Sequence, residues 1–399
     1  MRRTPARRPT MKDIARRAGV SESAVSFALN GRPGVSPATR DRVRRVAEQL
    51  GWQPSTAARA LSGEGSATVG LVLARPARTL GVESFFLHLV SGVQEALSHR
   101  RLGLLFQVVE DVDAEAAVYR RWWAEHRVDG LLVVDPRRDD PRPDLLDELG
   151  LPAVVIGSLP ERESGSPGRG GGEEHGPAPG AGPAAAGPAP RPGGDPGPGT
   201  GRVGAAAATT GRPGISNLWA DDAGAMASIV GHLHALGHRR IVHIAGLPEL
   251  THTRRRMDSL RAEAARRGLT DVRSVPTDYS DAQGAEATRR VLAEDRPPTA
   301  IVYDNDVMAV AGLAAAAERG LAVPADLSIV AWDDSVLCRS THPSLTALVR
   351  DTAAFGRHAA ELLIALLDGG PAVRIQDDLP RLAPRGSTAG PPGSQPYRQ

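Results

Sequence analysis

The alternation of short apolar runs with helical patterns constrains the fold of this 399-residue chain more than any other feature. From Thr68 the runs are TVGLVLA, LGLLFQVV, VDGLLVVD and LPAVVIG, separated by helical patterns such as 85–100 and 114–126. The alternation resumes at Ile215 with a helix over 223–236, the runs RRIVHIAG, RSVPTDYS, TAIVYDND and DLSIVAWDD, and a final helix near 355–367. This pattern predicts an α/β body of two parallel sheets covered by helices. A cleft is expected at the carboxyl ends of the strands, where such folds bind ligands.

Residues 161–214 interrupt this alternation. Glycine, proline and alanine dominate them, with PAPGAGPAAAGPAPRPGGDPGPG at the centre. Such a segment cannot bury enough apolar area to order itself, and it is far longer than the loops of compact domains. We predict a disordered insert in a linker between the two halves of the body.

Residues 10–51 carry three short helical patterns with their own caps. Thr10 and Asp13 fit a capping box, Ser21 can cap the second helix, and Ser36 with Pro37 can begin the third. Together with the tight turn at Gly19 this is the layout of a small all-α helix-turn-helix domain. Residues 1–9 are expected to form a disordered basic arm. Residues 52–65 are expected to form a hinge helix that is too short to be stable without a partner.

Positive charge is concentrated in this N-terminal part. The whole chain has a formal net charge of only +2, yet through Ser62 thirteen basic residues stand against four acidic ones. A basic head on a non-basic body suggests that the head alone meets a polyanion. On charge alone, a solvated arginine face remains an alternative.

Several classes of protein lack support in the sequence. Cys338 is the only cysteine, so no intrachain disulfide is possible. No apolar run approaches the roughly 20 residues of a membrane span, and no signal-peptide core follows the N-terminal charges; a cytoplasmic location is therefore expected. His234 and His238 have a metal-ligand spacing, but Gly237 between them should end their helix. No phosphate loop, nucleophile elbow or paired-acid motif is present. We expect no enzyme, no cofactor and no metal.

The stretch TMKDIARRAGVSESAVSFALNGRPGVSPATRDRVRRVAEQLGWQPSTAARAL resembles the DNA-binding and hinge region of the LacI/GalR (lactose repressor) family of bacterial transcription regulators. The resemblance continues in HLHALGHRRIVHIAG, in IVYDNDVMAVAGLAAAAERGLAVPADLSIVAWDD and in APRGST. It implies a body like that of periplasmic binding proteins, with two effector subdomains. One would comprise residues 66–160 and 348–370, the other residues 215–347 and 371–388, followed by a disordered tail over 389–399.

The resemblance also implies which residues meet DNA. Ser21 and Ser26 would hold phosphates, and Leu61 would wedge into the minor groove at the centre of the operator. Glu22, Ser23 and Phe27 occupy the specificity positions, the third of which is often arginine in the family. Phe27 could pack on a thymine methyl or, alternatively, belong to the core of the head. The remaining residues of this set are Thr10, Asn30, Arg40, Ala58 and Arg59.

Six residues of the body match effector-binding positions of the family: Phe85, Phe86, Arg256, Tyr279, Asn305 and Asp333. Guanidinium and carboxylate groups bind hydroxyls in pairs, and an aromatic ring covers the apolar face of a sugar. Arg256 has two arginine neighbours and Asp333 precedes Asp334, so either register could be displaced by a residue or two.

Taken together, these features predict a homodimeric repressor of a pseudo-palindromic operator, modulated by a small molecule such as a sugar. Two alternatives stay open. One is the same regulator with a non-sugar effector such as a purine. The other is a sugar-binding or sugar-processing protein with an incidental basic head.

Overall fold

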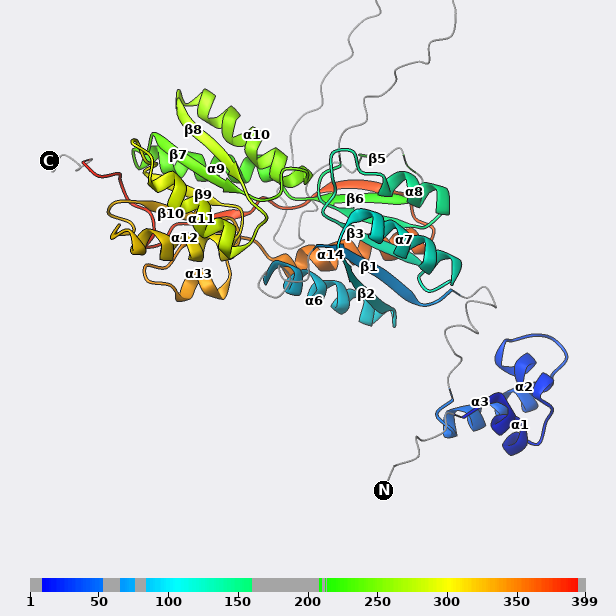
Figure 1. Ribbon diagram of the computed structural model, residues 1–399. Coiled ribbons are helices and arrows are strands. Elements are labelled where there is room, and N and C mark those ends of the chain that lie inside the picture. The colour runs from blue at the N-terminus through cyan, green and yellow to red at the C-terminus, as the bar shows by residue number, and fades with distance from the viewer. Residues whose placement is uncertain are drawn as a thin grey trace, which may run out of the picture. The chain divides into compact units, whose positions relative to one another are not determined.

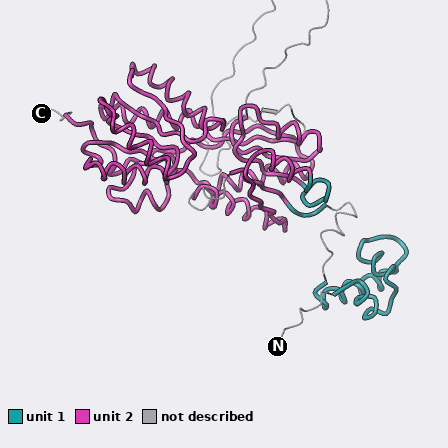
Figure 2. The backbone as a smooth tube through the Cα atoms, viewed as in Figure 1, with its two compact units in different colours: residues 1–68, 121–129 teal, residues 69–120, 130–399 magenta. Residues whose placement is uncertain are grey.

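The computed structural model describes residues 9–52, 65–75, 84–159, 208–209, 212 and 214–393 (Figure 1). The chain divides into two compact units, one of residues 1–68 with 121–129 and one of residues 69–120 with 130–399 (Figure 2). The predicted basic arm, the hinge helix and the greater part of the insert lie outside the described residues, as do Ala58, Arg59 and Leu61.

The head consists of three helices: α1 (Met11–Ala18), α2 (Glu22–Leu29) and α3 (Pro37–Gln49). The expected caps are present. The backbone N–H and the hydroxyl of Thr10 donate to Asp13, and the hydroxyls of Ser21 and Ser36 accept from the backbone at the third residue after each. Gly19 ends α1 with a φ of 66°, a left-handed conformation that suits glycine. One small core holds the three helices together, built on Ile14, Ala18, Val25, Ala28, Val43 and Val46.

The first sheet of the body has seven strands in the order β2-β1-β3-β4-β6-β12-β5. Their bounds are β1 (Thr68–Ala74), β2 (Gly103–Val109), β3 (Gly130–Val134), β4 (Ala153–Ile156), β5 (Ala208–Thr209), β6 (Ile215–Trp219) and β12 (Val373–Gln376). The pairs β1–β3, β3–β4, β4–β6 and β6–β12 are parallel, whereas β5 is antiparallel to β12.

Helices α6 (Ser84–His99) and α14 (Thr352–Leu367) bury their apolar faces with this sheet in one core. The two helices approach closely because each presents a glycine to the other. A Cβ on Gly92 would overlap the carbonyl of Ala353, and one on Gly356 would overlap that of Leu89. Two further helices, α7 (Val112–Ala124) and α8 (Arg142–Leu149), are joined by the buried ion pair between Glu115 and Arg142.

The second sheet has six strands in the order β13-β11-β10-β9-β7-β8. Its strands are β7 (Arg240–Ala245), β8 (Asp271–Pro276), β9 (Ala300–Tyr303), β10 (Ser328–Ala331), β11 (Thr346–Val349) and the antiparallel β13 (Arg381–Ala383). Its helices are α9 (Asp222–Ala235), α10 (Thr251–Arg266), α11 (Asp281–Leu292), α12 (Asp306–Glu318) and the short α13 (Val336–Ser340).

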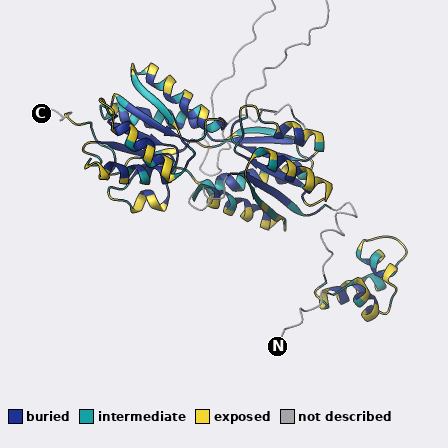
Figure 3. Cartoon of the chain, in the orientation of Figure 1, coloured by how far each residue is buried: buried dark blue, intermediate teal, exposed yellow. Residues whose placement is uncertain are grey.

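The inner strands of this sheet are buried on both faces (Figure 3). Along β9, Ala300 and Val302 pack with α9 and α10, while Ile301 and Tyr303 pack with α11 and α12. Successive side chains of a strand point to opposite faces. A continuous apolar run is therefore what a strand covered on both sides requires.

The division of the body into subdomains differs from the sequence-based boundaries. β6 and β12 were expected in the second subdomain, but both belong to the first sheet, where β6 pairs with β4 and β12 pairs with β6. The insert therefore interrupts the connection between two neighbouring strands of one sheet, not a linker between halves. Its C-terminal end also contributes strand β5, which corrects the boundary at residue 214. Strand order depends on contacts distant in sequence, which apolar periodicity does not encode.

Candidate functional site

The exposed face of α2 presents the residues predicted to meet DNA. Ser21, Glu22, Ser23 and Asn30 are all exposed, and the side chain of Phe27 is 38% exposed. Phe27 lies beside Gly34 and outside the core of the head, so its alternative assignment as a core residue is wrong. An exposed aromatic ring at this position is available to a partner.

The other described members of the predicted DNA-contacting set lie around this face. Ser26 is half-buried and its hydroxyl accepts a hydrogen bond from the Asn30 amide at 3.4 Å. Arg40 on α3 donates to the carbonyl of Arg32 at 3.1 Å. Thr10 is engaged in the cap of α1. The first turn of α2 leaves backbone N–H groups that can receive a phosphate oxygen.

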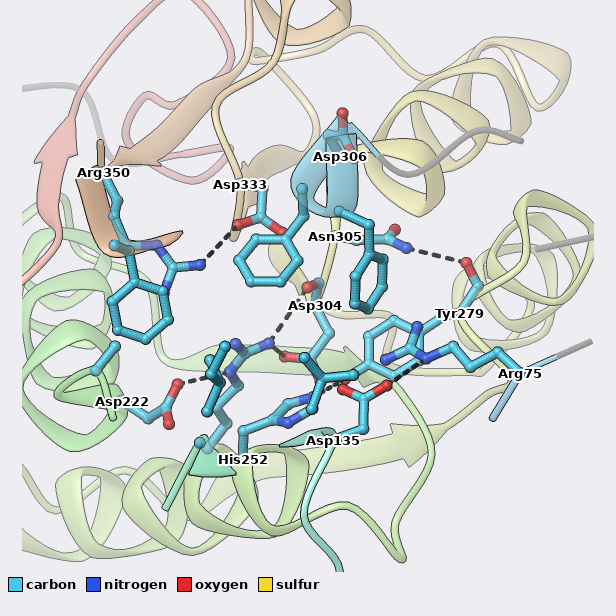
Figure 4. A pocket seen from close by; sticks show the side chains of 18 residues that line it. Arg75, Asp135, Asp222, His252, Tyr279, Asp304, Asn305, Asp306, Asp333 and Arg350 are labelled. Carbon is cyan, nitrogen blue, oxygen red and sulfur yellow. Dashed lines mark hydrogen bonds and ion pairs between the residues drawn. The ribbon is translucent and has the colours of Figure 1, made fainter. Parts of the chain in front are cut away.

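A cleft between the two sheets gathers the predicted effector residues. All six line it: Phe85, Phe86, Arg256, Tyr279, Asn305 and Asp333. Figure 4 shows cleft side chains that converge from both halves of the body, Arg75 and Asp135 after strands of the first sheet and Tyr279, Asn305 and Asp333 after strands of the second. Arg256, not Arg254 or Arg255, is the arginine that faces the cleft. Asp334 instead accepts two hydrogen bonds from Arg385, of 2.7 and 2.8 Å. Asp333, not Asp334, is therefore the aspartate that faces the cleft.

Arg256 is held rigidly at the floor of the cleft. Its Nε donates to Asp222 at 3.0 Å, its Nη1 donates to Asp304 at 3.2 Å, and its guanidinium lies 3.9 Å from the centre of the Trp332 ring. Burial alone would raise the pKa of Asp304, but Arg256 and the hydrogen bond from His243 hold that pKa well below its usual range. The guanidinium is thus fixed in place before any ligand arrives.

A second pair lies on the side of the first sheet, where Arg75 follows β1 and Asp135 follows β3. Arg75 donates to Asp135 at 2.7 Å, and its guanidinium lies 5.0 Å from the rings of both Phe86 and Tyr279. Asp135 and Tyr279 adopt φ values of 52° and 70°, which are uncommon for residues other than glycine. Such backbone strain tends to cluster at binding sites, where the surrounding structure enforces it.

Asp333 and Arg350 form a looser pair at the other end. Their nearest atoms are 3.7 Å apart, and Arg350 lies 5.0 Å from the centre of the Phe85 ring. Burial raises the pKa of Asp333 to about 6, against the lowering effect of Arg350. Burial also lowers the pKa of Arg350. Because the two side chains are too far apart to share a hydrogen bond, both can still form hydrogen bonds with a ligand.

Two of the predicted residues also maintain the architecture of the cleft. Asn305 caps α12 by accepting from the Met308 backbone N–H, and its amide donates to the carbonyl of Tyr279. The Tyr279 hydroxyl is hydrogen bonded to His252 at 2.9 Å and to Thr253 at 2.7 Å. Both side chains form part of the wall of the cleft, and their polar atoms are already hydrogen bonded within the protein.

Sequence reasoning missed several ionisable residues of the cleft: Arg75, Asp135, His252, Asp304, Asp306 and Arg350. Asp222, the first residue of α9, also lines the cleft. A simple signal marks four of them. Arg75, Asp135, Asp304 and Arg350 are the first residues after β1, β3, β9 and β11. Residues that directly follow parallel strands lie at the ligand-binding edge of such a sheet.

No group of three or more histidine, cysteine, aspartate or glutamate side chains within the described ranges is arranged to hold a metal ion. Cys338 is buried, and burial raises the pKa of its thiol to about 12. None of the helices in the described part of the chain is long and apolar enough to cross a membrane.

Comparison with known proteins agrees with this architecture. The model of the lacI family of bacterial regulatory proteins matches residues 10–55, and that of the periplasmic binding protein-like domain matches residues 230–388. The HTH-type transcriptional regulator CelR of Thermobifida fusca is 30% identical over 370 residues, which cover 91% of this chain and 93% of that protein. The HTH-type transcriptional repressor PurR of Photobacterium profundum is 27% identical over 361 residues, 89% of this chain and 91% of that protein.

A solved structure of the transcriptional regulator CelR in complex with cellobiose superimposes with a TM-score of 0.62 and 27% identity, covering 95% of this chain and 100% of that one. The similarity to these relatives extends over head and body together. The chain belongs to the LacI family of bacterial transcriptional regulators.

Proposed function

We propose that this regulator is a repressor that binds a pseudo-palindromic operator as a homodimer and responds to a sugar in the cleft. The observation that carries the proposal is the cleft itself, where guanidinium groups, carboxylates and aromatic rings line one cavity between two sheets. A ligand that touches both halves of the body binds one arrangement of them better than another. Such differential affinity is what an effector needs in order to shift a population.

The exposed residues of α2 support the DNA-binding part of the proposal. The second helix of a helix-turn-helix lies in the major groove, where its first residues reach base edges. Glu22 can accept from a cytosine amine, and Phe27 can pack on a thymine methyl. Ser21 and the N–H groups of the first turn suit a phosphate. These side chains therefore favour a half-site in which the protein contacts cytosine and thymine more than guanine.

The lining of the cleft supports a sugar. Carboxylates accept from vicinal hydroxyls, while the rings of Phe85 and Phe86, whose centres are 5.2 Å apart and whose planes meet at 82°, offer apolar surface to the ring C–H groups. The relative whose solved complex contains cellobiose makes a β-linked glucose disaccharide the first probe.

Gel shifts on DNA upstream of the protein's own gene test the DNA-binding part. We expect the wild type to shift this DNA, and Phe27→Ala to lose at most about 1–3 kcal/mol of binding free energy on the operator, the range for one mismatched base pair, with non-specific binding unchanged. Phe106→Ala, which removes an exposed ring from the body, is the matched control. Absence of a wild-type shift on this upstream DNA would refute the operator assignment.

A thermal-shift panel of sugars and nucleobases tests the effector part. Stabilisation by a sugar that also alters the gel shift supports the proposal. Stabilisation by a purine alone would reassign the effector while leaving the DNA-binding role intact.

Because Leu61 is expected to wedge into the operator, an unchanged shift with Leu61→Ala would contradict the hinge prediction, which falls outside the described residues.

A further inference from the structure

A second cavity, of about 370 Å³, lies outside the cleft and also has walls from both halves of the body. The segments that follow β3 and β4 form one wall, and the residues before α10 with the first two turns of that helix form the other. None of the described residues around it also lines the cleft. Its volume falls within the range of small-molecule sites. The second cavity is therefore a separate candidate site for a ligand.

The side chains around the second cavity carry an excess of positive charge. Arg138, Arg254 and Arg255 line it, and none of the three forms an ion pair with a carboxylate of the described ranges. Of its two carboxylates, Asp258 is already paired with Arg261 at 2.6 Å. The three arginines of the cleft, by contrast, each form an ion pair with an aspartate. Guanidinium groups without a protein partner favour an anionic ligand.

Two buried hydroxyl groups at the second cavity indicate the same ligand chemistry. Thr251 is 9% exposed, and its hydroxyl has no hydrogen-bond partner in the described part of the chain. Ser158 is 7% exposed, and its hydroxyl donates to the carbonyl of Leu159 over a long distance of 3.4 Å. Both residues line the cavity. A buried hydroxyl without a good partner is costly, and an acceptor oxygen of a ligand would remove that cost.

The N-terminus of α10 adds to the positive potential of the second cavity. Thr251 is the first residue of this sixteen-residue helix, and Leu250 before it supplies no side-chain cap. The first N–H groups of a helix have no partner within it, and the helix dipole places a partial positive charge at that end. Anions are therefore favoured at such a terminus. Here the terminus coincides with two of the three arginines and with one of the two buried hydroxyls.

We propose that the second cavity binds the phosphate group of a small phosphate monoester, held between the two halves of the body. A phosphate monoester carries between about 1.5 and 2 negative charges near neutral pH and presents three acceptor oxygens. The three arginines can neutralise this charge, and the hydroxyls of Ser158 and Thr251 can donate to the oxygens that the guanidinium groups leave. Arg138 and Ser158 belong to the first half, whereas Thr251 and Arg254 belong to the second, so a bound phosphate contacts both.

Titration calorimetry on the full-length protein, at pH 8 and constant ionic strength, tests this with inorganic phosphate, glycerol 3-phosphate and acetate. We expect both phosphates to bind. Acetate should bind at least about tenfold more weakly, because it carries one charge and two oxygens in place of two charges and three oxygens. Acetate that binds as tightly as phosphate overturns the proposal, and so does a result in which neither phosphate binds. Binding of inorganic phosphate without glycerol 3-phosphate contradicts an ester as the ligand.

Substitutions in each half locate the site, because the basic head also attracts phosphate. Arg138→Gln in the first half and Arg254→Gln in the second should each weaken phosphate binding about tenfold, as the loss of one charge-assisted hydrogen bond does. Arg266→Gln removes an exposed guanidinium from the same helix outside the cavity, so it should bind phosphate like the wild type. Equal affinity of all three variants would place the phosphate elsewhere and overturn the proposal. A loss with only one of the two cavity variants contradicts a site shared by both halves.

Thr251→Val tests the buried hydroxyl. This change keeps the shape of the side chain and removes a donor, so phosphate should bind more weakly while thermal stability without phosphate stays the same. A phosphate affinity equal to that of the wild type contradicts the assigned contact. These outcomes depend neither on the operator nor on the sugar, because no residue predicted to meet either one lines the second cavity. Failure of this proposal therefore leaves the proposed function unchanged.

Discussion

The ionisation of Asp333 depends on its burial in the cleft. Its carboxyl is raised to a pKa of about 6 by burial, so between pH 4 and 6 the folded state holds a proton that the unfolded chain releases. The contribution of Asp333 to stability is therefore present at low pH and is lost as pH rises through 6, by at most about 3 kcal/mol. Urea unfolding of wild type and Asp333→Asn at pH 5 and pH 7.5 measures this. We expect the variant to gain stability relative to wild type at the higher pH, and parallel pH profiles would contradict it.

Gly246 sets the position of the Tyr279 ring. A Cβ at Gly246 would overlap this ring, which is 5% exposed and hydrogen bonded through its hydroxyl to Thr253. Gly246→Ala should therefore displace Tyr279 and destabilise the protein by about 1–3 kcal/mol, as overpacking does. Effector affinity should fall as well. Gly231→Ala is the control, because the Arg267 guanidinium beside it can move and α9 gains a better helix former. Equal stability of both variants in thermal unfolding would refute the role of Gly246.

At the scale of elements, the loop after β3 and the start of α10 clasp the two halves of the body together. The Thr251 backbone N–H donates to the Pro136 carbonyl at 2.9 Å, and Arg137 forms an antiparallel bridge with Leu250. Thr251 is the first residue of α10, a position where helices accept proline. Leu250 has the extended backbone that proline requires before it, with a φ of −77° and a ψ of 135°. Thr251→Pro should thus remove one donor and leave the helix intact.

Opening of the cleft is the expected result of Thr251→Pro. A lost hydrogen bond is worth about 0.5–1.5 kcal/mol, enough to raise the fraction of open molecules roughly two- to tenfold. Distances between spin labels on α6, at exposed Leu87, and on α10, at exposed Arg261, report this fraction. Thr251→Val keeps the N–H and replaces a buried hydroxyl that has no partner, so it should match wild type. Identical distance distributions in the two variants would show that the clasp does not hold the cleft closed.

At the scale of the whole molecule, the sequence predicts individual helices and strands but not how the strands assemble into sheets. The caps of the head helices and the runs that became β1, β3, β4, β7, β9 and β10 are local signals, and the six expected cleft residues all line the cleft. The sheet to which β6 and β12 belong depends on pairing between segments far apart along the chain. Arg75 and Asp135 each directly follow a strand, which is a local signal, but their pairing is not, because 60 positions separate the two partners.

The C-terminal end of the insert makes contacts with the body. β5 pairs with β12, and Arg212 lies 2.6 Å from Asp144 and 2.5 Å from Asp147. Deletion of residues 163–206 spares these contacts and shortens the connection between β4 and β6. Since loop closure is less costly for a short loop, stability should stay the same or rise by about 1 kcal/mol.

Deletion of 163–213 also removes β5 and Arg212. The ion pairs of Arg212 are partly exposed and each is worth up to about 1 kcal/mol, and the strand pairing is lost with them. Thermal unfolding should therefore rank the first deletion at or above wild type and the second below it, while both keep the wild-type shift of operator DNA. If the shorter deletion loses as much stability as the longer one, residues 163–206 contribute to the fold, and the insert is not dispensable.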